Sequence, residues 1–142
     1  MQKNLNKKLL NKKNNNFTYD ALVIVPAFNE EKRVIKTINN LLKYFKNIIL
    51  INDGSSDKTK QYAEKLKIKI INHPINLGQG AAIETGLKYF LSHKKFKYVI
   101  TFDADGQHDA SEALNMLLLA KKTRSSAVSG SRFLEKKNAK MV

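Results

Sequence analysis

Residues 99–108 read VITFDADGQH, and this stretch decides how the rest of the chain is interpreted. An apolar run typical of a buried strand ends in Asp103 and Asp105, one residue apart. In extended chain, residues i and i+2 project to the same side, so both carboxylates face one point beyond the strand. Two like charges there repel unless a cation lies between them, and carboxylate oxygens suit Mg²⁺ or Mn²⁺. A solvated turn that uses Asp-Gly for its geometry explains the motif equally well.

Upstream and downstream of this stretch, apolar runs alternate with segments of helical spacing. Asn29 is expected to cap the first helix, and Asp109-x-x-Glu112 opens the last one with a capping-box-like signal. The alternation predicts an α/β fold, a Rossmann-like, mainly parallel sheet flanked by helices. The strands are predicted at 21–25, 48–51, 68–71 and 98–102, with a fifth starting at 127–129, and the helices at 30–45, up to about 66, 78–91 and 109–121.

Polar clusters follow three of the predicted strands: Asn29-Glu30, residues 53–57 and residues 103–105. Ligands of open parallel sheets bind beyond the carboxyl ends of the strands. The three loops are therefore expected to converge on one crevice.

Several residues near these loops have two readings each. Gln107 can add a neutral oxygen to a cation site, whereas His108 is either a ligand or base or packs beside the next helix. Asp53 either accepts hydrogen bonds from a nucleobase or ribose, or starts an Asx turn. The glycines of segment 76–82 (NLGQGAA) suit phosphate binding at a helix start or tight helix packing. Arg132 either clamps a phosphate or is surface charge.

Composition excludes some classes of function. The 142 residues contain no cysteine, which rules out disulfides, thiolate nucleophiles and Cys-based metal sites. No apolar run approaches the length of a membrane span, and the N-terminus has no apolar core of a signal peptide. We therefore expect a cytoplasmic protein, with peripheral association at the cytoplasmic face of a membrane as the other option.

The net charge of +14 raises the question of anionic partners. Residues 1–20 hold five Lys and one Asp, so they supply +4 of this charge. The lysines elsewhere are scattered without interleaved aromatic residues, so nucleic-acid binding is not expected. We divide the chain into a basic Lys/Asn-rich arm (1–19), one domain (20–134) and a polar tail (135–142).

Five segments in series resemble family 2 glycosyltransferases. They are IVPAFNEE (24–31), INDGSSDKT (51–59), NLGQGAA (76–82), FDADGQHD (102–109) and SGSRF (129–133). Their order and spacing look most like the subgroup that charges polyprenyl phosphates, the dolichol-phosphate mannosyltransferase-like enzymes. The resemblance implies the nucleotide-binding half of a GT-A fold, a UDP- or GDP-linked sugar donor, and a polyprenyl-phosphate or glycan acceptor.

The resemblance also implies roles for single residues. Pro26, Phe28 and Glu30 are expected to line the donor pocket, with Phe28 where the family often has Tyr. Asp53 is expected at the base or ribose, and Ala104 close to the donor. Mg²⁺ or Mn²⁺ is expected on Asp103, Asp105 and Gln107, with both carboxylates also serving the donor diphosphate. The catalytic residues implied are Asp105 and Arg132, the latter approaching a donor or acceptor phosphate.

The chain departs from the family after the SGSRF segment, where members normally continue with acceptor-binding elements. We therefore expect the donor-binding half alone, apparently truncated at its C-terminus. The alternatives are a non-catalytic nucleotide-sugar-binding fragment or the donor half of a split enzyme. Two weaker alternatives are a haloacid-dehalogenase-type phosphotransferase, with Asp103 as nucleophile, and a basic RNA-binding protein.

Overall fold

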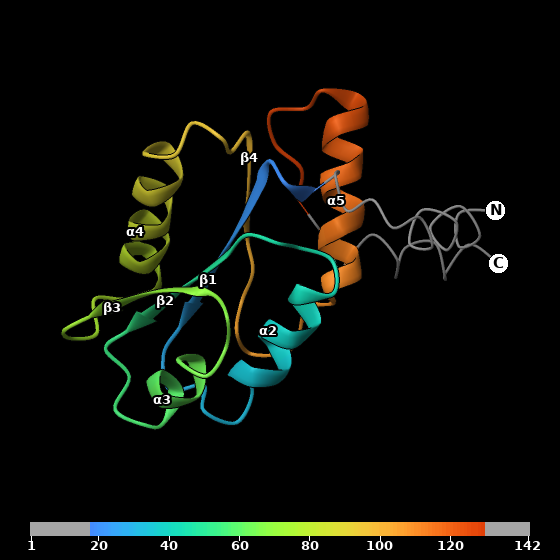
Figure 1. Ribbon diagram of the computed structural model, residues 1–142. Helices are drawn as coiled ribbons and strands as arrows, with labels where there is room; N and C mark the ends of the chain where they lie inside the picture. Colours follow the sequence, from blue (N-terminus) through green and yellow to red (C-terminus); the bar gives the residue numbers. More distant parts are fainter. Residues whose placement is uncertain (1–17, 130–142) are drawn as a thin grey trace, which may run out of the picture.

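A parallel four-stranded sheet with the strand order β3-β2-β1-β4 forms the centre of the fold (Figure 1). The computed structural model describes residues 18–129. Every strand pairing among these residues is parallel, so the predicted fold class is confirmed. The strands are β1 (Ala21–Ala27), β2 (Ile48–Asp53), β3 (Lys69–His73) and β4 (Tyr98–Thr101).

Helices cover both faces of this sheet, because each central strand sends alternate side chains to opposite sides. In β1, Val23 and Val25 pack toward α2 and α5, whereas Leu22 and Ile24 pack toward α4. Figure 1 shows α4 on one side of the sheet and α2 and α5 on the other. The helices are α2 (Val34–Leu42), α3 (Thr59–Ala63), α4 (Gln79–Leu91) and α5 (Ala110–Thr123). Both central strands are buried along their whole length, which accounts for their unbroken apolar sequences.

β1 extends two residues beyond its predicted end and includes Pro26, although proline is rare in central strands. The carbonyl of Ile24 accepts a hydrogen bond from the N–H of Phe102 at 2.9 Å, so the backbone groups of Ile24 face β4. Pro26, two residues on, faces the same side. Pairing with β4 ends at Thr101, and the missing N–H of Pro26 therefore removes no existing ladder bond.

Among the other predicted helix and strand boundaries, some are wrong and one helix cap is confirmed. Asn29 does not cap a helix: it has φ 54°, and α2 begins at Val34 after a turn over residues 31–33. Residues 127–129 form no strand, so the predicted start of a fifth strand is wrong, and the residues after it lie outside the described range. Asp109 does cap α5, because its carboxylate accepts a hydrogen bond from the N–H of Ser111.

Some predictions fall where the structure gives no description. Arg132, the polar tail and most of the basic arm lie outside residues 18–129. No helix within that range combines the length and apolar character that a membrane crossing requires.

Candidate functional site

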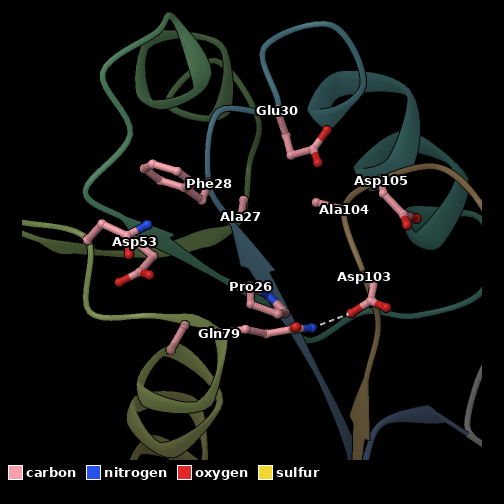
Figure 2. A pocket seen from close by; sticks show the side chains of 11 residues that line it. Pro26, Ala27, Phe28, Glu30, Asp53, Gln79, Asp103, Ala104 and Asp105 are labelled. Atoms are coloured by element: carbon pink, nitrogen blue, oxygen red, sulfur yellow. Dashed lines mark hydrogen bonds between the residues drawn. The ribbon is translucent and has the colours of Figure 1, made fainter.

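A cavity of about 320 Å³ opens beyond the carboxyl ends of β1, β2 and β4 (Figure 2). The chain runs from β1 through β2 to β3 on one side and returns to β4 on the other. The cavity therefore lies at the topological switch point, the usual ligand site of such sheets. It is lined by Pro26, Ala27, Phe28, Glu30, Asp53, Asn76, Gln79, Ala82, Asp103, Ala104 and Asp105.

The seven predicted donor-binding residues that lie within residues 18–129 all line this one cavity, which we call the switch-point pocket. They are Pro26, Phe28, Glu30, Asp53, Asp103, Ala104 and Asp105. Figure 2 shows Phe28 and Asp53 at one end of the pocket and Asp103 and Asp105 at the other. Gln107 follows them on the exposed loop and is not among the lining residues. The structure brings the side chains together, and what each one binds stays a prediction.

Two loops that frame the pocket are tied to each other through Asn29. Its left-handed backbone, which asparagine tolerates better than most residues, aims its polar groups at the loop after β2. Its N–H donates to Ser55 Oγ at 3.0 Å, and its Oδ1 accepts from the N–H of Ser56 at 3.0 Å. Asn29 thus fixes the chain between Phe28 and Glu30 relative to β2.

Asp57 and Thr59 continue this connection. The N–H of Glu30 donates to Thr59 Oγ1 at 2.8 Å, and that of Glu31 donates to Asp57 Oδ2 at 3.1 Å. Burial raises the pKa of Asp57, but hydrogen bonds from Thr59 and Glu31 outweigh it, so the pKa lies below its ordinary value. The backbone that carries Glu30 into the pocket is therefore held by the buried hydroxyl of Thr59 and the half-buried carboxylate of Asp57.

Asp53 is almost completely buried at the end of β2 and accepts three hydrogen bonds. His73 Nδ1 lies 2.7 Å from Oδ1, which also accepts from the N–H of Leu77 at 3.0 Å. Oδ2 accepts from the N–H of Gly78 at 2.8 Å. Since a carboxylate only accepts, Nδ1 is the donor, while His73 Nε2 contacts Thr85 Oγ1 at 2.9 Å. The Asp53 carboxylate thus holds the loop that starts α4.

The electrostatics of Asp53 agree with this geometry. Burial alone raises its pKa, but the hydrogen bonds from Leu77, His73 and Gly78 outweigh that effect and lower the pKa overall. The loop also packs onto Gly54, where a Cβ would lie 2.2 Å from the carbonyl carbon of Ile75. Asp53 lines the pocket, but most of its hydrogen-bonding capacity serves the protein itself, a role that the sequence did not indicate.

The Asp-x-Asp segment follows β4. Ala104 is buried, and its carbonyl accepts a hydrogen bond from Thr37 Oγ1 of α2 at 3.2 Å. Its neighbours Asp103 and Asp105 are only half-buried. Asp105 Oδ1 accepts from the N–H of Gln107 at 2.9 Å, which shapes the turn after it. The buried Ala104 therefore anchors two carboxylates at the pocket surface.

The carboxylates of Asp103 and Asp105 fit a cation whose coordination is completed by a bound phosphate. Within residues 18–129, no cluster of three or more His, Cys, Asp or Glu side chains is arranged to hold a metal ion. Mg²⁺ is commonly bound by one or two carboxylates together with substrate phosphates and water. Asp103 and Asp105 suit that mode of binding and do not suit an all-protein cage.

Sequence reasoning missed several residues that shape the pocket. Gln79 and Asn76 line it, and both belong to the NLGQGAA segment, which was considered only for its glycines. His73 and Thr37 support it from β3 and α2 through hydrogen bonds over 20 and 67 residues of sequence. Local sequence patterns do not predict contacts between residues so far apart in the chain.

Comparisons with known proteins agree with the fold. A family model described as glycosyl transferase family 2 matches residues 22–140. An uncharacterised protein of Methanocaldococcus jannaschii is 49% identical over 90 residues, which are 63% of this chain and 37% of that protein. A dolichyl-phosphate beta-glucosyltransferase of Trichomonas vaginalis is 38% identical over 130 residues, covering 78% of this chain and 39% of the relative.

A third relative is the UDP-N-acetylglucosamine–dolichyl-phosphate N-acetylglucosaminyltransferase of Methanococcus voltae. It is 38% identical over 106 residues, which are 61% of this chain and 41% of that enzyme. The chain therefore spans less than half the length of each of these three relatives.

The parallel sheet flanked by helices defines a Rossmann-like α/β protein. Since the family model covers most of its length, the chain belongs to glycosyl transferase family 2. This membership confirms the family expected from the five sequence segments. It leaves the phosphotransferase and RNA-binding alternatives without support.

Proposed function

We propose that this chain carries the donor-binding site of a glycosyltransferase that moves a sugar from a nucleotide diphosphate to a polyprenyl phosphate. The observation that carries the proposal is the convergence of Phe28, Glu30, Asp53, Asp103 and Asp105 on one cavity at the switch point. Family membership supports the reaction class. The dolichyl-phosphate substrates in the names of two relatives support the acceptor.

The pocket residues divide the work of binding the donor. The ring of Phe28, 46% exposed at one end of the pocket, offers an apolar face to a base or sugar. Asp103 and Asp105, at the other end, would hold Mg²⁺ or Mn²⁺ against the diphosphate, with Gln107 as a further ligand. When bound, the cation offsets the negative charge that develops on the departing nucleoside diphosphate. The anchored Ala104 keeps the two carboxylates at this end.

A phosphate acceptor suits this site because it needs no general base. A phosphate monoester is largely ionised at neutral pH, because its second pKa is about 6. An alcohol acceptor would need a base in hydrogen-bonding reach. The only histidine beside the Asp-x-Asp segment, His108, is already within 3.3 Å of Asp103 Oδ2. Arg132 would approach a phosphate from outside the described residues.

A polyprenyl phosphate lies in a membrane, so the pocket must come close to a bilayer surface. The lysines of residues 1–20 supply the positive charge for peripheral contact with anionic lipids at the cytoplasmic face. This contact would need no membrane-spanning segment.

Calorimetric titration with UDP-glucose, UDP-N-acetylglucosamine and GDP-mannose, with and without Mn²⁺, tests the donor site. One nucleotide class should bind, and Mn²⁺ should strengthen its binding. Asp105→Ala should weaken the Mn²⁺-dependent binding by roughly tenfold or more, because a metal ligand is lost. The matched control Glu64→Ala removes an exposed carboxylate directly after α3 that does not line the pocket, and this variant should bind as the parent does. Equal binding by Asp105→Ala and the parent would reject the site.

Transfer of labelled sugar to a polyprenyl phosphate separates the catalytic proposal from its alternative. The alternative is a nucleotide-sugar-binding fragment or the donor half of a split enzyme, and the chain's share of its relatives' length favours testing it. Mn²⁺-dependent donor binding without transfer would support that alternative and reject catalysis by this chain alone.

A further inference from the structure

Gln79 crosses the switch-point pocket from the first residue of α4 to the Asp-x-Asp segment. Its Nε2 donates a hydrogen bond to Asp103 Oδ1 at 2.9 Å, drawn as the dashed line in Figure 2. The other oxygen of Asp103, Oδ2, lies 3.3 Å from His108 Nε2. Both oxygens of this carboxylate are therefore engaged by side chains of the protein.

The backbone that carries Gln79 is held in place at the start of α4. Gly78, directly before it, has φ 95°, a conformation that side-chain-bearing residues rarely adopt. Its N–H is held by the buried carboxylate of Asp53 at 2.8 Å. The start of α4 is thus fastened to the end of β2, and the amide of Gln79 is presented to the pocket from a rigid base.

This contact sets up a competition at Asp103. A cation that coordinates Oδ1 must take that oxygen from the amide of Gln79. Hydrogen bonds to an ionised carboxylate are stronger than those between neutral groups, so the exchange has a measurable cost. Once displaced, the amide remains at the exposed wall of the pocket, where a bound nucleotide-sugar would bring acceptor oxygens within its reach.

We propose that Gln79 is a positioning residue that competes with the divalent cation for Asp103 and then donates to an oxygen of the nucleotide-sugar. This role rests on the proposed function. Cation binding breaks the hydrogen bond between the Gln79 amide and Asp103, and the freed amide then donates to the nucleotide-sugar. Gln79 therefore makes the binding of cation and donor interdependent, and such coupling acts equally in both directions.

Titration with Mn²⁺ alone, followed by electron paramagnetic resonance of the free ion, tests the competition. Gln79→Ala should bind Mn²⁺ roughly three- to tenfold more tightly than the parent, because no hydrogen bond must be broken. Gln79→Met removes the amide but keeps an unbranched side chain of similar length, so it should behave like Gln79→Ala. The control Gln61→Ala, at an exposed position of α3, should leave the Mn²⁺ affinity unchanged.

Two results overturn the competition. One is an Mn²⁺ affinity in Gln79→Ala that is equal to or below that of the parent, including no binding by either. The other is tighter binding by Gln79→Ala but not by Gln79→Met, which would assign the effect to side-chain bulk. Thermal melting of each variant checks that it is folded, which the exposed position of Gln79 favours.

Nucleotide-sugar titrations at zero and saturating Mn²⁺ test the coupling. The factor by which Mn²⁺ strengthens donor binding should be smaller in Gln79→Ala than in the parent, and an unchanged factor overturns the second part of the proposal. Failure of the proposed function looks different: no nucleotide-sugar binds to any variant, while Gln79→Ala still binds Mn²⁺ more tightly. Conversely, Mn²⁺-dependent donor binding with identical Mn²⁺ affinities rejects Gln79 and keeps the function.

Discussion

Asp53 joins stability to the shape of the site at the scale of a single residue. Its carboxylate accepts from Leu77, Gly78 and His73, and therefore connects β2, β3 and the start of α4. A buried acceptor with several donors cannot be removed without leaving those donors unpaired.

We predict that Asp53→Asn lowers the free energy of unfolding by about 2–4 kcal/mol at pH 7, because an amide NH₂ then faces a backbone N–H. The folded-state pKa of Asp53 is below its ordinary value of 3.8, so its contribution is fully present above pH 3.8. It is lost as the pH falls through the lower, folded-state pKa. The difference in unfolding free energy between the parent and Asp53→Asn should therefore shrink as the pH falls below 3.8.

Urea denaturation of both proteins from pH 7 downward measures this difference. Glu64→Gln, at an exposed carboxyl, serves as the control and should track the parent at every pH. A constant difference between Asp53→Asn and the parent across the acid range would show that ionisation of Asp53 is not involved.

Much of the site at this scale could be predicted from the sequence. Asp103 and Asp105 follow a predicted strand and belong to one of the five family-like segments. They line the pocket together with the other five residues predicted to bind the nucleotide-sugar. The partners of Asp53 could not be predicted, because its donors lie 20 to 25 residues away and two of them are backbone groups. Gln79 was missed for a similar reason, since its meaning comes from a side chain 24 residues along.

At the scale of elements, the contact between α4 and β1 depends on one glycine. A Cβ at Gly86 would lie 2.4 Å from Cγ2 of Ile24, so the helix approaches the strand more closely than any larger residue permits. The same helix contains Gly80, where a Cβ would meet nothing within 4 Å. The two positions form a matched pair within one element.

We predict that Gly86→Ala destabilises the protein by about 1–3 kcal/mol, because overpacking against Ile24 exceeds the gain in helix propensity. Gly80→Ala should change stability by less than about 1 kcal/mol, toward stabilisation. Urea unfolding of the two variants measures the contrast. Equal stabilities of the two variants would mean that α4 can shift away from the sheet freely.

The order of elements was predictable because apolar runs and helical spacing alternate along the chain. Their ends were less so. α2 starts four residues later than predicted, since Asn29 turns its backbone toward Ser55 and Ser56 instead of capping a helix. β1 runs past its predicted end because the cost of Pro26 depends on which neighbour it faces, and a single sequence does not reveal that.

At the scale of the whole molecule, the net charge of +14 bears on the proposed contact with a membrane. We predict that replacing Lys3, Lys7, Lys8, Lys12 and Lys13 by Gln weakens binding to anionic phospholipid vesicles by roughly tenfold or more at low salt. Co-sedimentation with vesicles measures this, and binding of the parent should fall as NaCl is added.

The control variant carries the same number of Lys→Gln changes at exposed positions elsewhere. These positions are Lys36, Lys46, Lys67, Lys94 and Lys122. If both variants lose vesicle binding equally, the arm has no special part and only the total charge matters. Mn²⁺ and nucleotide-sugar affinities should be the same in both variants, because none of the changed lysines lines the pocket.

Pro26 has a consequence for how the sheet ends. If the pairing of β1 with β4 continued by one step, the N–H of residue 26 would donate to the carbonyl of Phe102. Proline has no N–H, so that bond cannot form, and the two strands are free to separate immediately beyond Ile24 and Thr101. The absent N–H of Pro26 thus stops further pairing of β1 with β4, and the pocket between the ends of these strands stays open.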